Sequence, residues 1–180
     1  VHYRCLSEVA KMPMREATSL PVAKCIYERL PFPARNGGLE RAFIEWAQAD
    51  AGVEAFCKIS ETRHDFVRLR YVKEDGLPAF YSPDFLVRTV DAIFLVETKA
   101  QEQVNNPNVQ RKLKAATAWC ERINGLPDAE GQMRRRWHYV LLGERIFAEW
   151  RNKGARLPEL LDFARVRPLA SVISQGRLGF

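Results

Sequence analysis

Two segments rich in aromatic and β-branched residues lie close together near the middle of the chain, and their separation restricts how they can pair. They are residues 79–87 (Ala-Phe-Tyr-Ser-Pro-Asp-Phe-Leu-Val) and 93–98 (Ile-Phe-Leu-Val-Glu-Thr), and their composition is typical of β-strands. Only five residues, 88–92, connect them. A parallel crossover needs about a dozen residues or more, so the two strands should form an antiparallel hairpin.

The connection also predicts which residues face each other across the hairpin. With the turn centred between Val90 and Asp91, Asp84 lies opposite Glu97. Directly opposed residues have Cβ atoms roughly 4.5–5.5 Å apart, so the two carboxylates could share one cation. We favour a four-residue connection, because Val-Asp is a poor two-residue turn and an odd loop length would break the pairing.

Alternation along the second strand adds a lysine to the two acids. One face of the strand receives Ile93, Leu95, Glu97 and Lys99, and the other receives Phe94, Val96 and Thr98. Both faces are apolar before the charged tip, so the strand should be buried on both sides and its terminal charges need partners. Pro83 lacks a backbone donor, which predicts a bulge or a sheet edge just before Asp84.

These residue types suit a divalent metal. Mg²⁺ prefers oxygen ligands and commonly takes only one or two protein carboxylates with water and substrate phosphate. Asp84 and Glu97 supply such carboxylates, and the backbone carbonyl of Thr98 is a candidate further ligand. Lys99 could orient an attacking hydroxide or stabilise developing charge. The pattern therefore predicts a metal-dependent nuclease with Mg²⁺ as cofactor and Mn²⁺ as a substitute.

A third acid lies upstream in a segment with helical spacing, residues 39–47. The apolar stripe of this segment consists of Leu39, Phe43, Trp46 and Ala47. Glu40 borders the stripe, so its carboxylate could lean toward the metal. The alternative is an ordinary acid of the first helical turn, where the helix dipole favours negative charge. The position of Glu40 alone leaves both interpretations open.

Three motifs together resemble the PD-(D/E)XK nuclease superfamily: Leu39-Glu40-x-x-Phe43, Tyr81-x-Pro83-Asp84-Phe85 and Val96-Glu97-Thr98-Lys99. More narrowly, residues 36–142 resemble the C-terminal endonuclease domain of type III restriction enzyme Res subunits and similar helicase-linked restriction endonucleases. The resemblance implies a Mg²⁺-dependent DNA endonuclease with Asp84, Glu97 and Lys99 as its catalytic core and Glu40 as the helix acid. Many relatives have Gly where this chain has Ala100, a difference that leaves the catalytic set intact.

Basic residues provide candidate contacts for DNA. The chain carries 28 Lys and Arg against 22 Asp and Glu, a formal net charge of +6, which suits a polyanionic partner. On the expected helix after the second strand, the candidate DNA-binding residues are Gln110, Arg111, Lys112 and Lys114, and a second basic group is Arg134–Arg136. A solvated helix face and a solvated loop are the alternatives.

The predicted elements belong to the α/β class. After the helix over 39–47 we expect strands at 54–59, 66–72, 79–87 and 93–98, a helix at 109–123, a strand at 137–142, and short helices at 145–153 and 157–163. We predict a restriction-endonuclease-like α-β-β-β-α-β core, with a central mixed sheet flanked by helices. Residues 1–35 should form a lead-in that packs on the core, with a helical piece at 22–29, and residues 36–180 the endonuclease domain.

The remaining features concern the setting of the protein. Four cysteines without zinc-ligand spacing indicate reduced thiols of a cytoplasmic protein. No apolar run is long enough to span a bilayer, so we expect no membrane partner. The chain starts at Val1 and has no phosphate-binding loop motif, which suggests a domain from a larger protein. The resemblance implies that the rest of that protein carries an ATP-dependent helicase or translocase region.

Two classes of function fit these observations. In the first, the protein cleaves double-stranded DNA as a type III-like restriction nuclease or a repair nuclease, and a homodimer would supply one active site for each strand. In the second, the same fold is a catalytically silent DNA-binding or scaffolding module. The intact set of two acids and a lysine favours the first class.

Overall fold

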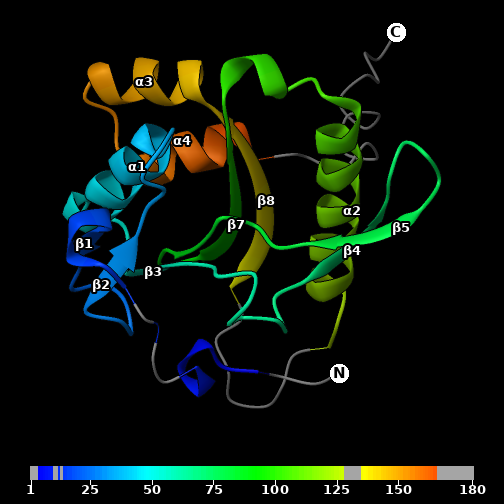
Figure 1. Cartoon of the computed structure of the whole chain (residues 1–180), viewed down its shortest axis with the longest axis horizontal. Coiled ribbons are helices and arrows are strands. Elements are labelled where there is room, and N and C mark those ends of the chain that lie inside the picture. The colour runs from blue at the N-terminus through cyan, green and yellow to red at the C-terminus, as the bar shows by residue number, and fades with distance from the viewer. Residues whose placement is uncertain (1–3, 10–11, 13, 128–134, 166–180) are drawn as a thin grey trace, which may run out of the picture.

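The computed structural model describes residues 4–9, 12, 14–127 and 135–165, and its centre is a four-stranded sheet (Figure 1). The strands are β3 (Ala55–Lys58), β6 (Phe85–Arg88), β7 (Ala92–Lys99) and β8 (Arg136–Gly143), in the order β3-β6-β7-β8. The pairs β3–β6 and β6–β7 are antiparallel, whereas β7–β8 is parallel. The predicted fold class, α/β with a central mixed sheet flanked by helices, is therefore confirmed.

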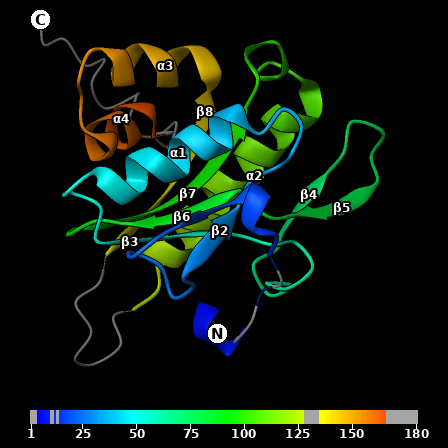
Figure 2. The ribbon, with the colours of Figure 1, turned by 60° about the vertical axis from the view of Figure 1, so that its left-hand side comes forward.

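Helices cover both faces of this sheet (Figures 1 and 2). The helices are α1 (Gly38–Ala49), α2 (Pro107–Asn124), α3 (Glu144–Asn152) and α4 (Leu157–Ala164). Phe94 and Val96 of β7 belong to the core that includes residues of α1, α3 and α4, whereas Leu95 belongs to a second core with residues of α2. The predicted alternation of β7 is thus confirmed, and the strand is buried on both faces.

The hairpin between β6 and β7 has the predicted register. The paired residues are Phe85 with Val96, Leu86 with Leu95, Val87 with Phe94, and Arg88 with Ile93. Four residues connect the last pair, and the Thr89 N–H closes the turn by donating to the Ala92 carbonyl at 2.9 Å. Continued by one residue beyond Phe85, this register sets Asp84 opposite Glu97.

The single strand predicted over 79–87 is wrong. Residues 78–81 form β5 (Pro78–Tyr81), which pairs with β4 (Leu69–Val72) in a separate two-stranded sheet beside α2 (Figure 1). The chain leaves this hairpin at Ser82, and β6 then joins the main sheet at Phe85. Pro83 lies in the break, where its missing N–H removes no ladder bond.

The helical piece predicted over 22–29 is also wrong. This region is the connection of a small antiparallel hairpin, β1 (Ser19–Pro21) and β2 (Arg29–Pro31), which Val22 extends by donating to the Glu28 carbonyl at 2.9 Å. Extended backbone places Leu30 fully inside the main core, and this burial outweighs the weak local helical pattern. Short 3-10 turns occur at η1 (Leu6–Glu8), η2 (Glu16–Thr18) and η3 (Gln101–Gln103).

Two further expectations concern cysteines and membranes. All four cysteines are free: Cys57 and Cys120 are buried, Cys25 is partly buried and Cys5 is exposed. In the part of the chain that the structure describes, no helix combines the length and the apolar character needed to cross a membrane.

Candidate active site

Asp84 lies at the junction between the β4–β5 hairpin and the main sheet, and hydrogen bonds to both neighbouring strand regions hold it. Its Oδ2 accepts hydrogen bonds from the backbone N–H of Thr98 at 2.7 Å and from the Thr98 hydroxyl at 2.8 Å. Its backbone carbonyl accepts from the N–H of Ile59, just after β3, at 2.8 Å. The carboxylate is therefore oriented by β7, the strand that carries Glu97 and Lys99.

Glu97 is a buried acid, with only 3% of its surface exposed. Its Oε1 lies 2.7 Å from the Nζ of Lys99, whereas its Oε2 is buried and has no hydrogen-bond partner among the described residues. Burial, followed by the negative charge of Asp84, raises the pKa of Glu97 to about 7, although Lys99 acts in the opposite direction. A buried oxygen without a partner beside a second carboxylate is an arrangement that a cation would stabilise.

Lys99 lies at the partly exposed end of β7. Burial tends to lower the pKa of its ammonium, but Glu97 and Asp84 together raise the pKa above its ordinary value. The side chain is therefore protonated at neutral pH, and it presents a positive charge next to both acids.

The predicted role of Thr98 is that of a metal ligand through its backbone carbonyl. The observed contacts are different: its N–H and its hydroxyl donate hydrogen bonds to Asp84. The role of the carbonyl stays a prediction.

Glu40 projects from α1 and contacts a residue that sequence reasoning missed. The Nζ of Lys58, at the end of β3, contacts Glu40 Oε2, and both side chains are mostly buried. Among the described residues, no three His, Cys, Asp or Glu side chains group closely enough to hold a metal ion. The structure therefore pairs Glu40 with Lys58 and does not gather it with Asp84 and Glu97 into one ligand set.

A sequence signal for Lys58 does exist. It is the charged residue that ends the apolar run Ala55-Phe56-Cys57, and such a residue needs a partner when the strand is buried. Its partner could not be deduced, because Glu40 belongs to a distant helix.

Of the four candidates on α2, Lys112 faces the site. Its Nζ lies 5.0 Å from the centre of the Tyr81 ring, and its charge lowers the pKa of Glu97. The Gln110 amide instead donates to the Val104 carbonyl at 2.7 Å. Arg111 and Lys114 are exposed to solvent. In the second basic group, Arg135 pairs with Glu54 at 3.0 Å, and Arg134 lies outside the described residues.

The donor set fits a hard divalent cation. Asp84 and Glu97 offer carboxylate oxygens, and one of these oxygens is buried without a partner among the described residues. Mg²⁺ is commonly held by one or two carboxylates, with water filling the rest of its coordination sphere. The three-acid site predicted to include Glu40 requires a rearrangement of the Glu40–Lys58 pair.

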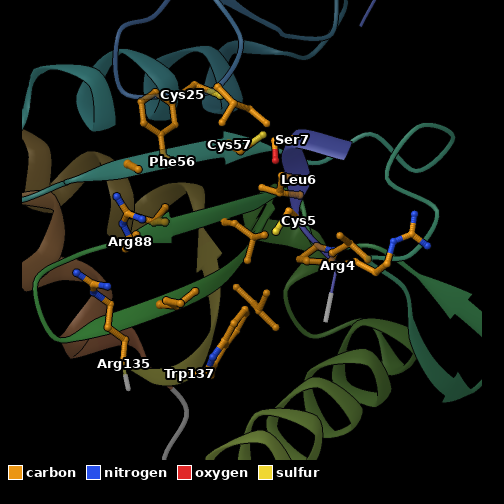
Figure 3. A pocket seen from close by; sticks show the side chains of 18 of the residues that line it. Arg4, Cys5, Leu6, Ser7, Cys25, Phe56, Cys57, Arg88, Arg135 and Trp137 are labelled. Carbon is orange, nitrogen blue, oxygen red and sulfur yellow. The ribbon is translucent and has the colours of Figure 1, made fainter. Parts of the chain in front are cut away.

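A cavity of about 1190 Å³ lies near the site but does not contain it. Its lining includes Cys25, Cys57, Arg88, Arg135 and Trp137, together with the η1 segment (Figure 3). Pro83 reaches its wall, whereas Asp84, Glu97 and Lys99 do not line it. The chemistry expected of the acids therefore belongs to the end of β7 and not to this cavity.

Comparison with known proteins agrees with this geometry. Residues 57–125 match the family model described as TnsA-like endonuclease N terminal, a family of the PD-(D/E)XK type. The matched segment runs from β3 to the end of α2, so it includes Asp84, Glu97 and Lys99 but not Glu40. No curated protein and no solved structure matches the chain. The match supports a nuclease function and gives no support to the narrower resemblance to type III Res subunits.

Proposed function

We propose that the protein is a metal-dependent DNA endonuclease that hydrolyses phosphodiester bonds through Asp84, Glu97 and Lys99. The observation that carries the proposal is the Oε2 of Glu97, which is buried and has no hydrogen-bond partner among the described residues. The other oxygen of this carboxylate lies 2.7 Å from the Nζ of Lys99, and the negative charge of Asp84 helps to raise the pKa of Glu97. Burying such a carboxylate is costly for a fold. Perturbed buried acids of this kind are enriched at functional sites.

Each residue has a separate role in this proposal. Asp84 and Glu97 would hold Mg²⁺, or Mn²⁺ in its place, and the bound ion would supply Lewis-acid polarisation of the phosphate and a water of lowered pKa. Lys99, protonated and partly exposed, would orient the attacking water and balance the charge that develops on the phosphate. Thr98 would keep the Asp84 carboxylate aimed at the site through its two hydrogen bonds.

The substrate and setting are further proposals. Double-stranded DNA is the proposed substrate, with the exposed Arg111 and Lys114 of α2 as phosphate contacts. The role as part of a type III-like restriction enzyme, with an ATP-dependent helicase or translocase region, depends on the motif resemblance alone. A homodimer is proposed for double-strand cleavage, because each chain supplies one site.

A catalytically silent DNA-binding module is the competing function. It is favoured by one observation: Lys58 and Lys99 each already contact an acid, Glu40 and Glu97 respectively. Two such ion pairs could be structural.

A cleavage assay separates the two functions. The purified chain is incubated with plasmid and linear DNA in Mg²⁺ or Mn²⁺, beside Asp84→Ala, Lys99→Ala and the exposed control Asp65→Ala. We expect cleavage by the wild type and the control, and a loss of about 100-fold or more in the two site variants. Wild-type protein that binds DNA, leaves it uncut with either metal and matches its site variants would refute the nuclease.

A further inference from the structure

Lys58 occupies an unusual position for a lysine. Only 16% of its side chain is exposed, and its Nζ contacts the Oε2 of Glu40 on α1. The same Nζ lies 5.2 Å from the centre of the Phe85 ring. A buried ammonium needs compensation, and here an acid and an aromatic ring both provide it, so the charge is fixed in one place.

The backbone brings this ammonium next to the candidate active site. Lys58 pairs with Phe85 across β3 and β6, and Phe85 directly follows Asp84. The next residue, Ile59, donates its N–H to the Asp84 carbonyl at 2.8 Å. Burial lowers the pKa of Lys58, yet Asp84 and then Glu97 act to raise it, so the ammonium lies within electrostatic reach of both acids.

Two of the three acids are therefore each paired with a lysine, and Asp84 is held by Thr98 instead. Lys99 contacts Glu97, and Lys58 contacts Glu40. Across the described residues, no group of three ligating side chains is assembled for a metal. Glu40 is thus paired with Lys58 on the α1 side of the sheet, apart from Asp84 and Glu97 at the end of the β6–β7 hairpin.

We propose that the ammonium of Lys58 takes the place of a second metal ion by pairing with Glu40, the acid that such an ion would need as a ligand. The site then holds a single divalent ion through Asp84 and Glu97. This inference rests on the proposed nuclease function and specifies its metal content. Lys58 is in this view a positioning residue, which restrains Glu40 and contributes fixed positive charge.

Charge at the site also disfavours a second ion. A second ion would have to enter beside the ammonium of Lys58, and like charges at close range in a partly buried site repel strongly.

Metal counting tests the inference directly. Binding of Mn²⁺ to the full chain is measured by titration calorimetry and by the electron paramagnetic resonance signal of free Mn²⁺. We expect one Mn²⁺ for the wild type and two for Lys58→Met, because the freed Glu40 becomes a ligand. The double variant Lys58→Met with Glu40→Gln should return to one.

A second variant protects the test against misfolding of Lys58→Met. Glu40→Gln alone should still bind one Mn²⁺, with an affinity within about threefold of the wild type. Circular dichroism verifies that each variant is folded. Two Mn²⁺ per wild-type chain, or loss of the single ion in Glu40→Gln, would overturn the inference.

Failure of the inference differs from failure of the proposed function. A wild type that cuts DNA with two Mn²⁺ per chain remains a nuclease and refutes only the role of Lys58. A wild type that binds no Mn²⁺ and cuts no DNA refutes the nuclease itself, and the inference with it.

Discussion

Asp84 and Thr98 are joined by two hydrogen bonds to one oxygen, at 2.7 Å from the backbone N–H and 2.8 Å from the hydroxyl. The backbone bond alone would leave the carboxylate free to turn about it, and the hydroxyl bond removes that freedom. The residue between the two charged members of the Glu97-x-Lys99 motif therefore orients the acid of the neighbouring strand.

Replacing Thr98 with Val should weaken metal binding while keeping the fold. Val retains the shape and the backbone N–H, but it removes one hydrogen bond to a charged group, worth about 1.5–3 kcal/mol. We expect Mn²⁺ affinity to fall by roughly 10-fold or more. The matched control is Thr117→Val, which removes a hydroxyl bond to the Leu113 carbonyl within α2. Equal Mn²⁺ affinity in both variants would contradict the orienting role.

Glu97 should make the metal-free protein less stable as the pH rises. Its folded pKa of about 7 lies above its ordinary value of 4.5, so the folded state holds the proton more tightly. The associated stability is fully present below pH 4.5 and is lost as the pH rises to about 7, with a slope of up to about 1.4 kcal/mol per pH unit.

Urea denaturation in EDTA between pH 5 and 8 measures this effect as the difference between wild type and Glu97→Gln. The glutamine cannot titrate, so the free energy of unfolding of the variant should lack this slope and exceed that of the wild type near pH 8. Parallel pH profiles for the two proteins would show that Glu97 titrates normally.

The exposed cations of α2 should contribute to DNA affinity through charge alone. Removing Arg111 and Lys114 together, both as Ala, should weaken DNA binding equally for all sequences. The slope of log K against log salt should fall by about 0.9 for each phosphate that the variant no longer neutralises. Fluorescence anisotropy over a salt series measures the slope, and Lys153→Ala, just after α3, is the control. An unchanged slope would place the DNA elsewhere.

His64 should be important for stability. It is fully buried; its Nδ1 accepts the Ser60 N–H at 3.0 Å, and its Nε2 lies 2.9 Å from the Tyr27 hydroxyl, which donates to the Val9 carbonyl at 2.8 Å. His64→Ala would break this chain of contacts and leave a cavity, at a cost of about 2–4 kcal/mol. Thermal denaturation measures the loss, and the half-buried His138→Ala should cost less. Similar losses in both variants would argue against this role.

Local sequence patterns predicted the hairpin geometry well. The period-two alternation of β7 and the short connection after Arg88 specified both the register and the faces, because one residue of slippage would bury the wrong side chains. The prediction of one strand over 79–87 was wrong, because amino-acid composition could not show that its two halves join different sheets. The prediction of a helix over 22–29 was wrong because strand pairing buries Leu30, and this tertiary effect is not visible in the local pattern.

The candidate site was predicted only in part for a related reason. Asp84, Glu97 and Lys99 belong to one hairpin, so spacing along the chain was enough to relate them. Lys58 and Glu40 come from two other elements, β3 and α1, and only the packing of α1 on the sheet brings them together. Pairings between distant elements leave no periodic trace in a single sequence.

The break between β5 and β6 places the β4–β5 hairpin directly before Asp84 in the chain. Only Ser82 and Pro83 separate the end of β5 from Asp84. The hairpin also exposes Val72, Leu77 and Phe80. We therefore expect movement of this hairpin to be transmitted through two residues of backbone to the carboxylate that we propose as a metal ligand.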